Sequence, residues 1–405
     1  MGSLSFNPIS LDYTANPKPY FAEYHRERPL FHDETFNTWV AHGYEEVRGF
    51  LGHPDMGTRV ELMEGFEEES ARRLERWPVT EGARRESGFG EPEKHARMRR
   101  ILGVDLKPSM VRKMAATVED VVAKHCAPLQ SEREVDVVKL VAGVPLTTIS
   151  RVLGVDESSA ESEVFLASAP AFFRGMNPLA TDELHDDAEA AAGKMLAVMQ
   201  SIVEERLRRP QEDMISQVLE AAKDVEDISV KELTHIFVIL LAAGTDTTRL
   251  STSLAVRTLL DHPDHLEALR ADPSRVDGAI LELLRYESPT KFLSRIASED
   301  VSWKGQTIPR GSHVLLSIFG AGWDEKVVER PERLDFERDS RINMSFGYGA
   351  HYCMGVHLAR LQLGAMLRFF LAHMPKGTTY DPDGIEWDPA NLFLREITRM
   401  PLRLR

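Results

Sequence analysis

Apolar residues recur every three to four positions along most of this chain, which is the spacing of a helix with one buried face. The longest such stretch runs from Ser229 to His262 and carries polar residues within an apolar centre. Shorter helices are expected over Tyr44 to Leu51, Val276 to Tyr286 and Met354 to His373, with a series over 110–225 broken at Pro128, Gly154, Pro178 and Pro210. The pattern therefore predicts a mainly helical protein.

Segments with the alternating pattern of a β-strand are few and short. Leu30 to His32 and Thr38 to Ala41 are expected to pair across the polar turn between them, and Thr290 to Arg295 is expected to form a further strand. Together with the segments 292–316 and 385–404, they predict a small β region beside the helices.

Residues 60–90 are rich in charge and show no clear period, which predicts a surface loop over a pocket. No Gly/Ser-rich linker, repeat or low-complexity block divides the 405 residues. Residues 1–405 are therefore expected to form a single domain with a substantial core.

Charge narrows the possible partners. The formal net charge of −15 argues against nucleic-acid binding, because neutralising phosphates requires a basic face. Lys94 to Lys113 departs from this balance, with seven Lys or Arg residues against one acid, Asp105. The stretch is either a solvated helix face, or a docking patch or set of ligands for anionic groups.

The sequence predicts a soluble, cytoplasmic protein that makes no membrane contact. Its first ten residues lack the basic and apolar regions of a signal peptide, and its longest apolar run, Ile236 to Gly244, is too short to span a bilayer. Only Cys126 and Cys353 are present, so neither a disulfide framework nor a zinc cluster is expected. Cys126 ends an apolar helical stretch and is expected in the core.

Cys353 lies in the stretch from Ser345 to Arg360, S-F-G-Y-G-A-H-Y-C-M-G-V-H-L-A-R. Gly347 and Gly349 permit a tight turn, and Gly355 leaves room for a flat group to approach the backbone. A cysteine at a helix N-terminus is favoured as the thiolate. The alternative is that Cys353 is a small buried residue, as most lone cysteines are.

The centre of the longest helix, A-A-G-T-D-T-T, contains residues that local stability does not explain. An interior glycine such as Gly244 costs up to about 1 kcal/mol against alanine, and a buried carboxylate such as Asp246 costs more unless it is partnered. Thr247 can donate a hydrogen bond to the carbonyl of Ala243, four residues earlier, which loosens the helix at this point.

Both stretches resemble the cytochrome P-450 family, the first its haem-binding loop and the second its oxygen-binding motif. The resemblance implies a mainly α, triangular fold with a small β region and a haem between that helix and the cysteine loop. It implies that Cys353 binds the iron of haem b, that Phe346 shields the sulfur, and that Gly347 and Gly355 admit the haem. A thiolate ligand favours O–O cleavage.

The resemblance also assigns roles to other side chains. His95 and Arg99, four residues apart on one helix face, are implied to bind haem propionates, as are Arg295 and His351. Without the family, the His95–Arg99 spacing would indicate a surface pair. Resemblance to the oxygen-binding motif implies that Ala243 and Gly244 lie beside the haem. It also implies that Thr247 holds dioxygen and its waters and that Asp246 relays protons.

The implied activity is monooxygenation, in which one atom of O₂ enters a substrate and the other leaves as water. Electrons are expected from NAD(P)H through a ferredoxin and its reductase, since no bound flavin or nicotinamide is indicated. An acidic ferredoxin is expected to dock on the basic proximal face formed by Lys94 to Lys113. A peroxide-driven haem peroxygenase and a non-enzymatic haem sensor or carrier are the alternatives, and the Asp246–Thr247 pair disfavours both.

Family position also suggests an apolar pocket for a hydrophobic small molecule such as a terpenoid, steroid, fatty acid or polyketide. Its expected lining is Phe172, Phe173, Ile239, Leu240, Thr290, Phe292 and Phe393, although aromatic residues near a helix end are usually core. Lys291 either binds a substrate carboxylate or faces solvent. Glu282 and Arg285 are implied to form a buried structural pair, with Arg333 as the first candidate for a third partner and Arg338 as the second.

Overall fold

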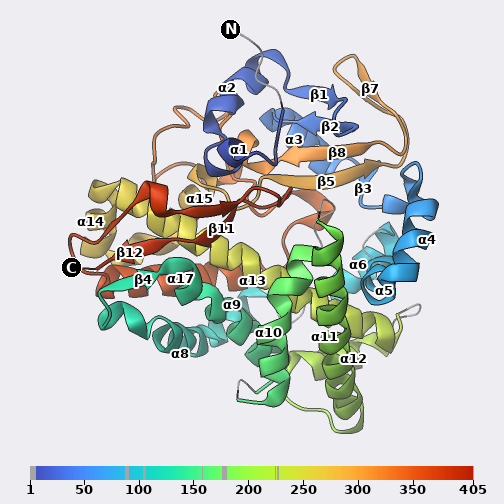
Figure 1. The fold of residues 1–405 in the computed structure, drawn as a ribbon, viewed down its shortest axis with the longest axis horizontal. Helices are drawn as coiled ribbons and strands as arrows, with labels where there is room; N and C mark the ends of the chain where they lie inside the picture. The colour runs from blue at the N-terminus through green and yellow to red at the C-terminus, as the bar shows by residue number, and fades with distance from the viewer. Residues whose placement is uncertain are drawn as a thin grey trace.

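A computed structural model describes residues 6–86, 91–103, 106–156, 158–175, 180–223, 225 and 228–404. Most of these residues are helical (Figure 1). The α-helices are α1 (Leu11–Ala15), α2 (Lys18–Glu27), α3 (Tyr44–Gly52), α4 (Phe66–Arg76), α5 (Pro78–Glu86), α6 (Pro92–Leu102), α7 (Pro108–Lys113), α8 (Ala115–His125), α9 (Val137–Leu153), α10 (Ala160–Gly175), α11 (Asp182–Arg208), α12 (Met214–Ala222), α13 (Val230–Asp261), α14 (Pro263–Ala271), α15 (Val276–Tyr286), α16 (Ile318–Ala321) and α17 (Val356–His373).

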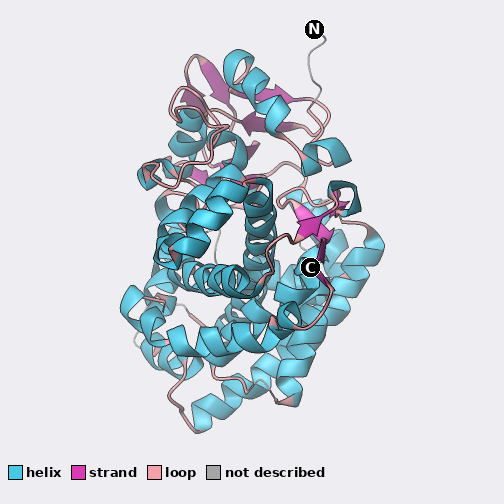
Figure 2. Ribbon diagram, turned by 90° about the vertical axis from the view of Figure 1, so that its left-hand side faces the viewer, coloured by secondary structure: helices cyan, strands magenta, loops and turns pink. Residues whose placement is uncertain are grey.

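The strands form small sheets. They are β1 (Leu30–Asp33), β2 (Thr38–Ala41), β3 (Met56–Gly57), β4 (Glu134–Asp136), β5 (Phe292–Ala297), β6 (Val301–Trp303), β7 (Gln306–Ile308), β8 (His313–Ser317), β9 (Thr379–Tyr380), β10 (Glu386–Asp388), β11 (Glu396–Arg399) and β12 (Pro401–Arg403). One sheet has the order β1-β2-β8-β5-β3, and the others are β4-β12-β9, β10-β11 and β6-β7. Figure 2 shows the strands gathered at one end of the molecule and near the C-terminus.

Helix α13 runs through the middle of the helical body (Figure 1). A capping box fixes its start, because the Ser229 hydroxyl accepts a hydrogen bond from the Glu232 N–H, and the Glu232 carboxylate accepts one from the Ser229 N–H. Its 32 residues extend about 48 Å at the usual helical rise. It packs against α9, α11 and α17.

Two hydrophobic cores hold the two halves of α13. One core takes residues of the helix between Leu233 and Ala242 and combines them with α10, α11 and α12. The other takes residues between Leu250 and Leu259 and combines them with α8, α14, α15 and α17. Residues 243–249 belong to neither core. Apolar burial therefore anchors both ends of the helix and leaves its centre available for polar chemistry.

The structure confirms most of the predicted elements. The hairpin pairs Leu30 with Ala41 and Asp33 with Thr38, and α3, α13, α15 and α17 lie where they were expected, within two residues at each end. The strand predicted from Thr290 begins two residues later, at Phe292. Among the described residues, no helix is both long and apolar enough to cross a bilayer.

The prediction of a surface loop over 60–90 is wrong for most of the described part of that segment, which contains α4 and α5. Its charges belong to specific pairs. The Glu81 carboxylate is fully buried and accepts hydrogen bonds from the Ser70 hydroxyl, from Arg73 Nε at 3.2 Å and from Arg84 Nε at 2.7 Å. A sequence dense in charge formed helices because its carboxylates and cations pair between and within them.

Candidate active site

The cysteine loop is a tight turn that places Cys353 just before α17. Gly347 and Gly349 have φ of +76° and +74°, a region that favours glycine. A Cβ on Gly349 would lie 2.6 Å from the Leu51 carbonyl oxygen, so the close approach also requires glycine. The turn is closed by the Cys353 N–H, which donates to the Phe346 carbonyl at 2.9 Å. The loop therefore holds the sulfur in a fixed position.

The start of α17 favours the Cys353 thiolate, and burial of the side chain opposes it. Helix α17 begins at Val356, and the Cys353 side chain is half-buried. Burial raises the pKa of the Cys353 thiol, while the Gly355 N–H and the Arg99 charge oppose that shift only in part. A coordinated metal ion deprotonates a thiol outright.

The centre of α13 faces open space. Ala243 is exposed although its neighbours Leu241 and Ala242 are fully buried, and a Cβ on Gly244 would meet nothing within 4 Å. The Thr247 hydroxyl donates to the Ala243 carbonyl at 3.0 Å, which confirms the predicted hydrogen bond. This part of the helix thus presents its backbone and a hydroxyl group to open space.

Asp246 is ion-paired. Its carboxylate accepts a hydrogen bond from Arg249 Nε at 3.0 Å, and Arg249 also donates to Glu396 on β11 at 2.6 Å. The sequence analysis did not identify Arg249 or Glu396 as site residues. Arg249 follows Asp246 by three residues on the same helix, and this spacing predicts a contact between the two side chains. Nothing local indicated the second.

Four side chains that can carry positive charge converge from three elements: His95 and Arg99 on α6, Arg295 on β5, and His351 in the cysteine loop. The His95 and His351 rings stack with centroids 4.1 Å apart. Burial, followed by the charges of Arg295, His95 and Arg99, lowers the pKa of His351 to about 3. The fold thus brings these four side chains together, whereas spacing in the sequence linked only His95 and Arg99.

The two arginines of this cluster have no carboxylate partner within the described part of the chain. Arg99 donates to the Tyr352 carbonyl at 2.7 Å, and Arg295 Nη1 to the Ser294 carbonyl at 2.8 Å. Arg295 Nε is buried without a partner, and burial lowers the Arg295 pKa to about 10. Within the described part of the chain, neither arginine forms an ion pair. A buried cation such as Arg295 is costly unless an anion pairs with it.

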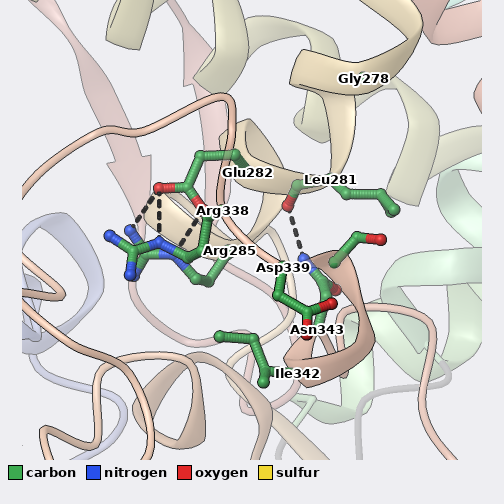
Figure 3. Close-up of a pocket in the computed structure, with 9 residues that line it drawn as sticks. Gly278, Leu281, Glu282, Arg285, Arg338, Asp339, Ile342 and Asn343 are labelled. Carbon is green, nitrogen blue, oxygen red and sulfur yellow. Dashed lines mark hydrogen bonds and ion pairs between the residues drawn. The ribbon is translucent and has the colours of Figure 1, made fainter.

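Glu282 and Arg285 form the predicted buried pair, with Arg285 Nε and Nη2 at 2.7 and 2.8 Å from the two carboxylate oxygens. The third partner is Arg338, whose Nε lies 3.2 Å from Glu282, as Figure 3 shows. The first candidate, Arg333, is wrong because it contributes only its carbonyl, which accepts from Arg338 at 3.0 Å. Asn343 donates to the Leu281 carbonyl, so α15 also fixes the segment that enters the cysteine loop.

The predicted pocket residues divide into two groups. Ile239, Leu240, Thr290 and Phe393 are half-buried. The other described side chains point elsewhere, and these two assignments are corrected: Phe172 is buried in the core with α11 and α13, and Phe292 is buried in an aromatic cluster with Phe6 and Tyr13. The Phe173 side chain lies outside the described residues.

Strand geometry explains the position of Phe292. Side chains alternate along β5, so Phe292 lies on the face opposite to Arg295, whereas Leu293 shares the Arg295 face. A Cβ on Gly347 would lie 3.7 Å from Leu293 Cδ1, which places Leu293 beside the cysteine loop. Leu293 is thus a site residue that the sequence analysis missed. The alternation of side chains along the strand, which puts Leu293 on the same face as Arg295, could have identified it.

Neither interpretation of Lys291 holds. Its side chain is buried, with Nζ donating to the Pro8 carbonyl at 2.8 Å and to the Thr14 hydroxyl at 3.3 Å. Burial lowers the Lys291 pKa to about 7. Lys291 therefore ties the N-terminal segment to the sheet.

These features define a protein in which a cysteine loop, a cluster of side chains that can carry positive charge and the polar centre of a long helix form one site. The chain belongs to the cytochrome P450 family, whose model matches residues 30–375. It is a monooxygenase, an oxidoreductase, and has the fold of that family.

Its relatives include a bacterial hydroxylase and a bacterial epoxidase. The 6-deoxyerythronolide B hydroxylase of Saccharopolyspora erythraea is 29% identical over 388 residues, covering 91% of this chain and 90% of the relative. The epothilone C/D epoxidase of Sorangium cellulosum is 29% identical over 377 residues, covering 91% and 89%. The crystal structure of epothilone D-bound cytochrome P450epoK matches with a TM-score of 0.90 at 27% identity, covering 99% of both chains.

The family implies a haem cofactor with O₂ as co-substrate, a redox partner and a small-molecule substrate. The chain fits a haem in three respects. Arg295 is buried without a carboxylate partner among the described residues, the backbone at Gly244 and Gly355 borders open space, and Cys353 offers a soft sulfur ligand. The residues present are thus those that a haem requires.

The two cysteines provide a direct test of the ligand. Cys353→Ser should retain the fold but lose the red-shifted Soret band of the reduced carbon monoxide complex, because a hydroxyl group does not replace a thiolate on iron. Cys126→Ala, which changes a cysteine buried in the core, is the matched control and should keep the band. Retention of the band in Cys353→Ser would show that another group binds the iron.

Proposed function

We propose that this enzyme uses haem b to oxidise a large hydrophobic natural product, of which a polyketide macrolactone is the best candidate. The observation that carries the proposal is the opening at Ala243–Thr247, where an acid and an alcohol adjoin a loosened turn of α13. The names of the relatives support the substrate class. Half-buried Ile239, Leu240 and Phe393 would supply apolar contacts.

Bound haem supplies the activation of dioxygen. Cys353 would bind its iron, while His95, Arg99, Arg295 and His351 would hold the propionates through charge-assisted hydrogen bonds. Each of these four side chains is positioned by packing or by a hydrogen bond before any ligand arrives. The chain therefore presents a preorganised cradle.

Residues of α13 would handle protons. The Thr247 hydroxyl donates to the Ala243 carbonyl, so its oxygen is free to accept a hydrogen bond from a water held beside the reacting oxygen. Half-buried Asp246 would exchange protons with solvent and pass them to that water. A peroxide-driven peroxygenase or a haem sensor has no need for this pair, which disfavours both alternatives.

A spectral titration with macrolactones, steroids, terpenoids and fatty acids ranks the candidate substrate classes, because a substrate that displaces water from haem iron changes the spectrum. Macrolactones should give the tightest response. A response confined to the other classes would contradict the polyketide assignment while leaving the oxygenase chemistry intact.

With a substrate that the enzyme oxidises, substitutions of Thr247 and of Asp246 should have different effects. Thr247→Ala should leave haem binding and first-electron reduction intact but release electrons as hydrogen peroxide, since the water is no longer held. Asp246→Asn should slow turnover, by up to the roughly 10²–10⁴-fold that a positioned proton relay contributes, and enlarge the solvent isotope effect.

Thr258→Ala is the matched control, because Thr258 makes the same hydrogen bond to a carbonyl four residues earlier in a buried part of α13. It should change thermal stability and leave product formed per NAD(P)H unchanged. Wild-type coupling and rate in both Thr247→Ala and Asp246→Asn would refute the proposed relay.

We further propose that an acidic ferredoxin, reduced by a ferredoxin reductase, delivers electrons at the basic stretch Lys94–Lys113. Arg99 donates to the Tyr352 carbonyl, directly before Cys353, so α6 lies against the cysteine loop. The exposed cations of the stretch are Arg100, Lys107, Arg112 and Lys113. Arg97 is half-buried and Lys94 pairs with Glu232, so these two are poor docking residues.

Charge reversal tests this docking face. Lys107→Glu and Arg112→Glu should slow reduction by an acidic ferredoxin more at low than at high ionic strength, because electrostatic steering is screened by salt. Arg26→Glu reverses another exposed cation, on α2 and outside the stretch, and should have no such effect. Equal rates and equal salt dependence in all three variants would discard the surface.

A further inference from the structure

Arg249 is fixed by all three of its guanidinium nitrogens. Nε donates to Asp246 at 3.0 Å, Nη2 to Glu396 at 2.6 Å, and Nη1 to the Ile397 carbonyl at 3.0 Å. The side chain is almost completely buried. Since a guanidinium presents its donors in a rigid plane, the position of Glu396 on β11 determines where the Arg249 fork can meet Asp246.

The cluster holds two carboxylates and one guanidinium, so its charge is −1 when both Asp246 and Glu396 are ionised. Burial raises the pKa of Glu396, and the Arg249 charge opposes that shift. The other charged groups that act on Glu396 or are acted on by it are Asp388 on β10 and Lys291 before β5. The Asp246 charge also raises the pKa of Glu396.

The same cluster extends to the loop between β10 and β11. The second oxygen of Glu396 accepts from the Asn391 amide at 3.4 Å. The Asn391 side-chain oxygen in turn accepts from the N–H groups of Phe393 at 3.1 Å and Leu394 at 2.9 Å. Phe393 is one of the half-buried residues proposed to line the substrate pocket. A continuous set of polar contacts thus joins that loop to the acid on α13.

We propose that Glu396 is a positioning residue for Asp246, acting through Arg249, and that it links the substrate-facing loop to proton delivery. The inference rests on the proposed role of Asp246 as a proton relay. A merely structural ion pair between β11 and α13 would look the same in distances alone. The two roles differ in whether removing the Glu396 charge changes chemistry that depends on Asp246.

Glu396→Gln keeps the shape of the side chain and removes its charge. Arg249 would then lose one of its two carboxylate partners, and its fork would no longer be fixed against Asp246 from the β11 side. The pH profile of turnover should change, because Glu396, whose pKa is raised by burial, no longer titrates beside Arg249. Turnover at neutral pH should fall by about three- to tenfold, a part of what a complete relay contributes, with a larger solvent isotope effect.

The carbon monoxide band and the substrate dissociation constant should stay unchanged in Glu396→Gln. Glu386→Gln, which removes an exposed carboxylate from the same hairpin, is the matched control and should behave as wild type. Unchanged turnover and pH profile in Glu396→Gln would overturn the proposal.

A double-mutant cycle separates positioning from structure. In an Asp246→Asn background, Glu396→Gln should cause no further loss, whereas an equal loss in both backgrounds would overturn the proposal. If Glu396→Gln loses its carbon monoxide band, Arg249→Lys serves instead, because lysine keeps the charge but cannot form the fork. It should slow turnover only while Asp246 is present. The effect of Asp246→Asn by itself reports on the relay independently of Glu396.

Discussion

The structure depends on a buried positive charge, that of Arg295, which no carboxylate neutralises within the described residues. His95, Arg99, Arg295 and His351 come from α6, β5 and the cysteine loop, and they converge at one place. Arg295 keeps a buried Nε without a partner, which is expensive unless a ligand supplies the anion. A dianionic group such as a haem with two propionates resolves that cost. The packing of α6, β5 and the cysteine loop against one another therefore also forms the cofactor site.

The division of α13 between two cores provides the second requirement. Both ends are anchored by apolar packing, so the centre can carry a glycine, a hydroxyl group and an ion-paired acid without loss of the helix. The open space at Ala243 and Gly244 then lies beside polar groups whose positions are fixed. Elsewhere, the Glu282–Arg285–Arg338 cluster stabilises the segment that leads into the cysteine loop.

Sequence reasoning predicted those features that depend on local spacing. The limits of α15, the turn before Cys353 and the hydrogen bond from Thr247 to the Ala243 carbonyl all follow from residues close together in the chain. The family resemblance added the long-range assembly of the four cationic side chains. Neither the local spacing nor the family resemblance distinguished Arg338 from Arg333 as the third partner of the Glu282–Arg285 pair. The choice depends on how a loop without regular structure returns to α15.

Other features required the tertiary structure. Arg249 and Glu396 are 147 residues apart, and no local pattern links them. Phe292 was assigned to the pocket although it lies opposite to Arg295 on the same strand, an error that the alternation of a strand explains. Helices α4 and α5 were hidden by their charge, since the ion pairs that make that charge compatible with helices form only on folding.

The proposed role of His95, Arg99, Arg295 and His351 is to bind the two carboxylates of the haem. The most direct measurement compares the affinity of the haem-free protein for haem b and for its dimethyl ester, which lacks both negative charges. Each lost set of charge-assisted hydrogen bonds costs about 1.5–3 kcal/mol, so the ester should bind at least roughly 100-fold more weakly. Equal affinities for the two molecules would contradict the account.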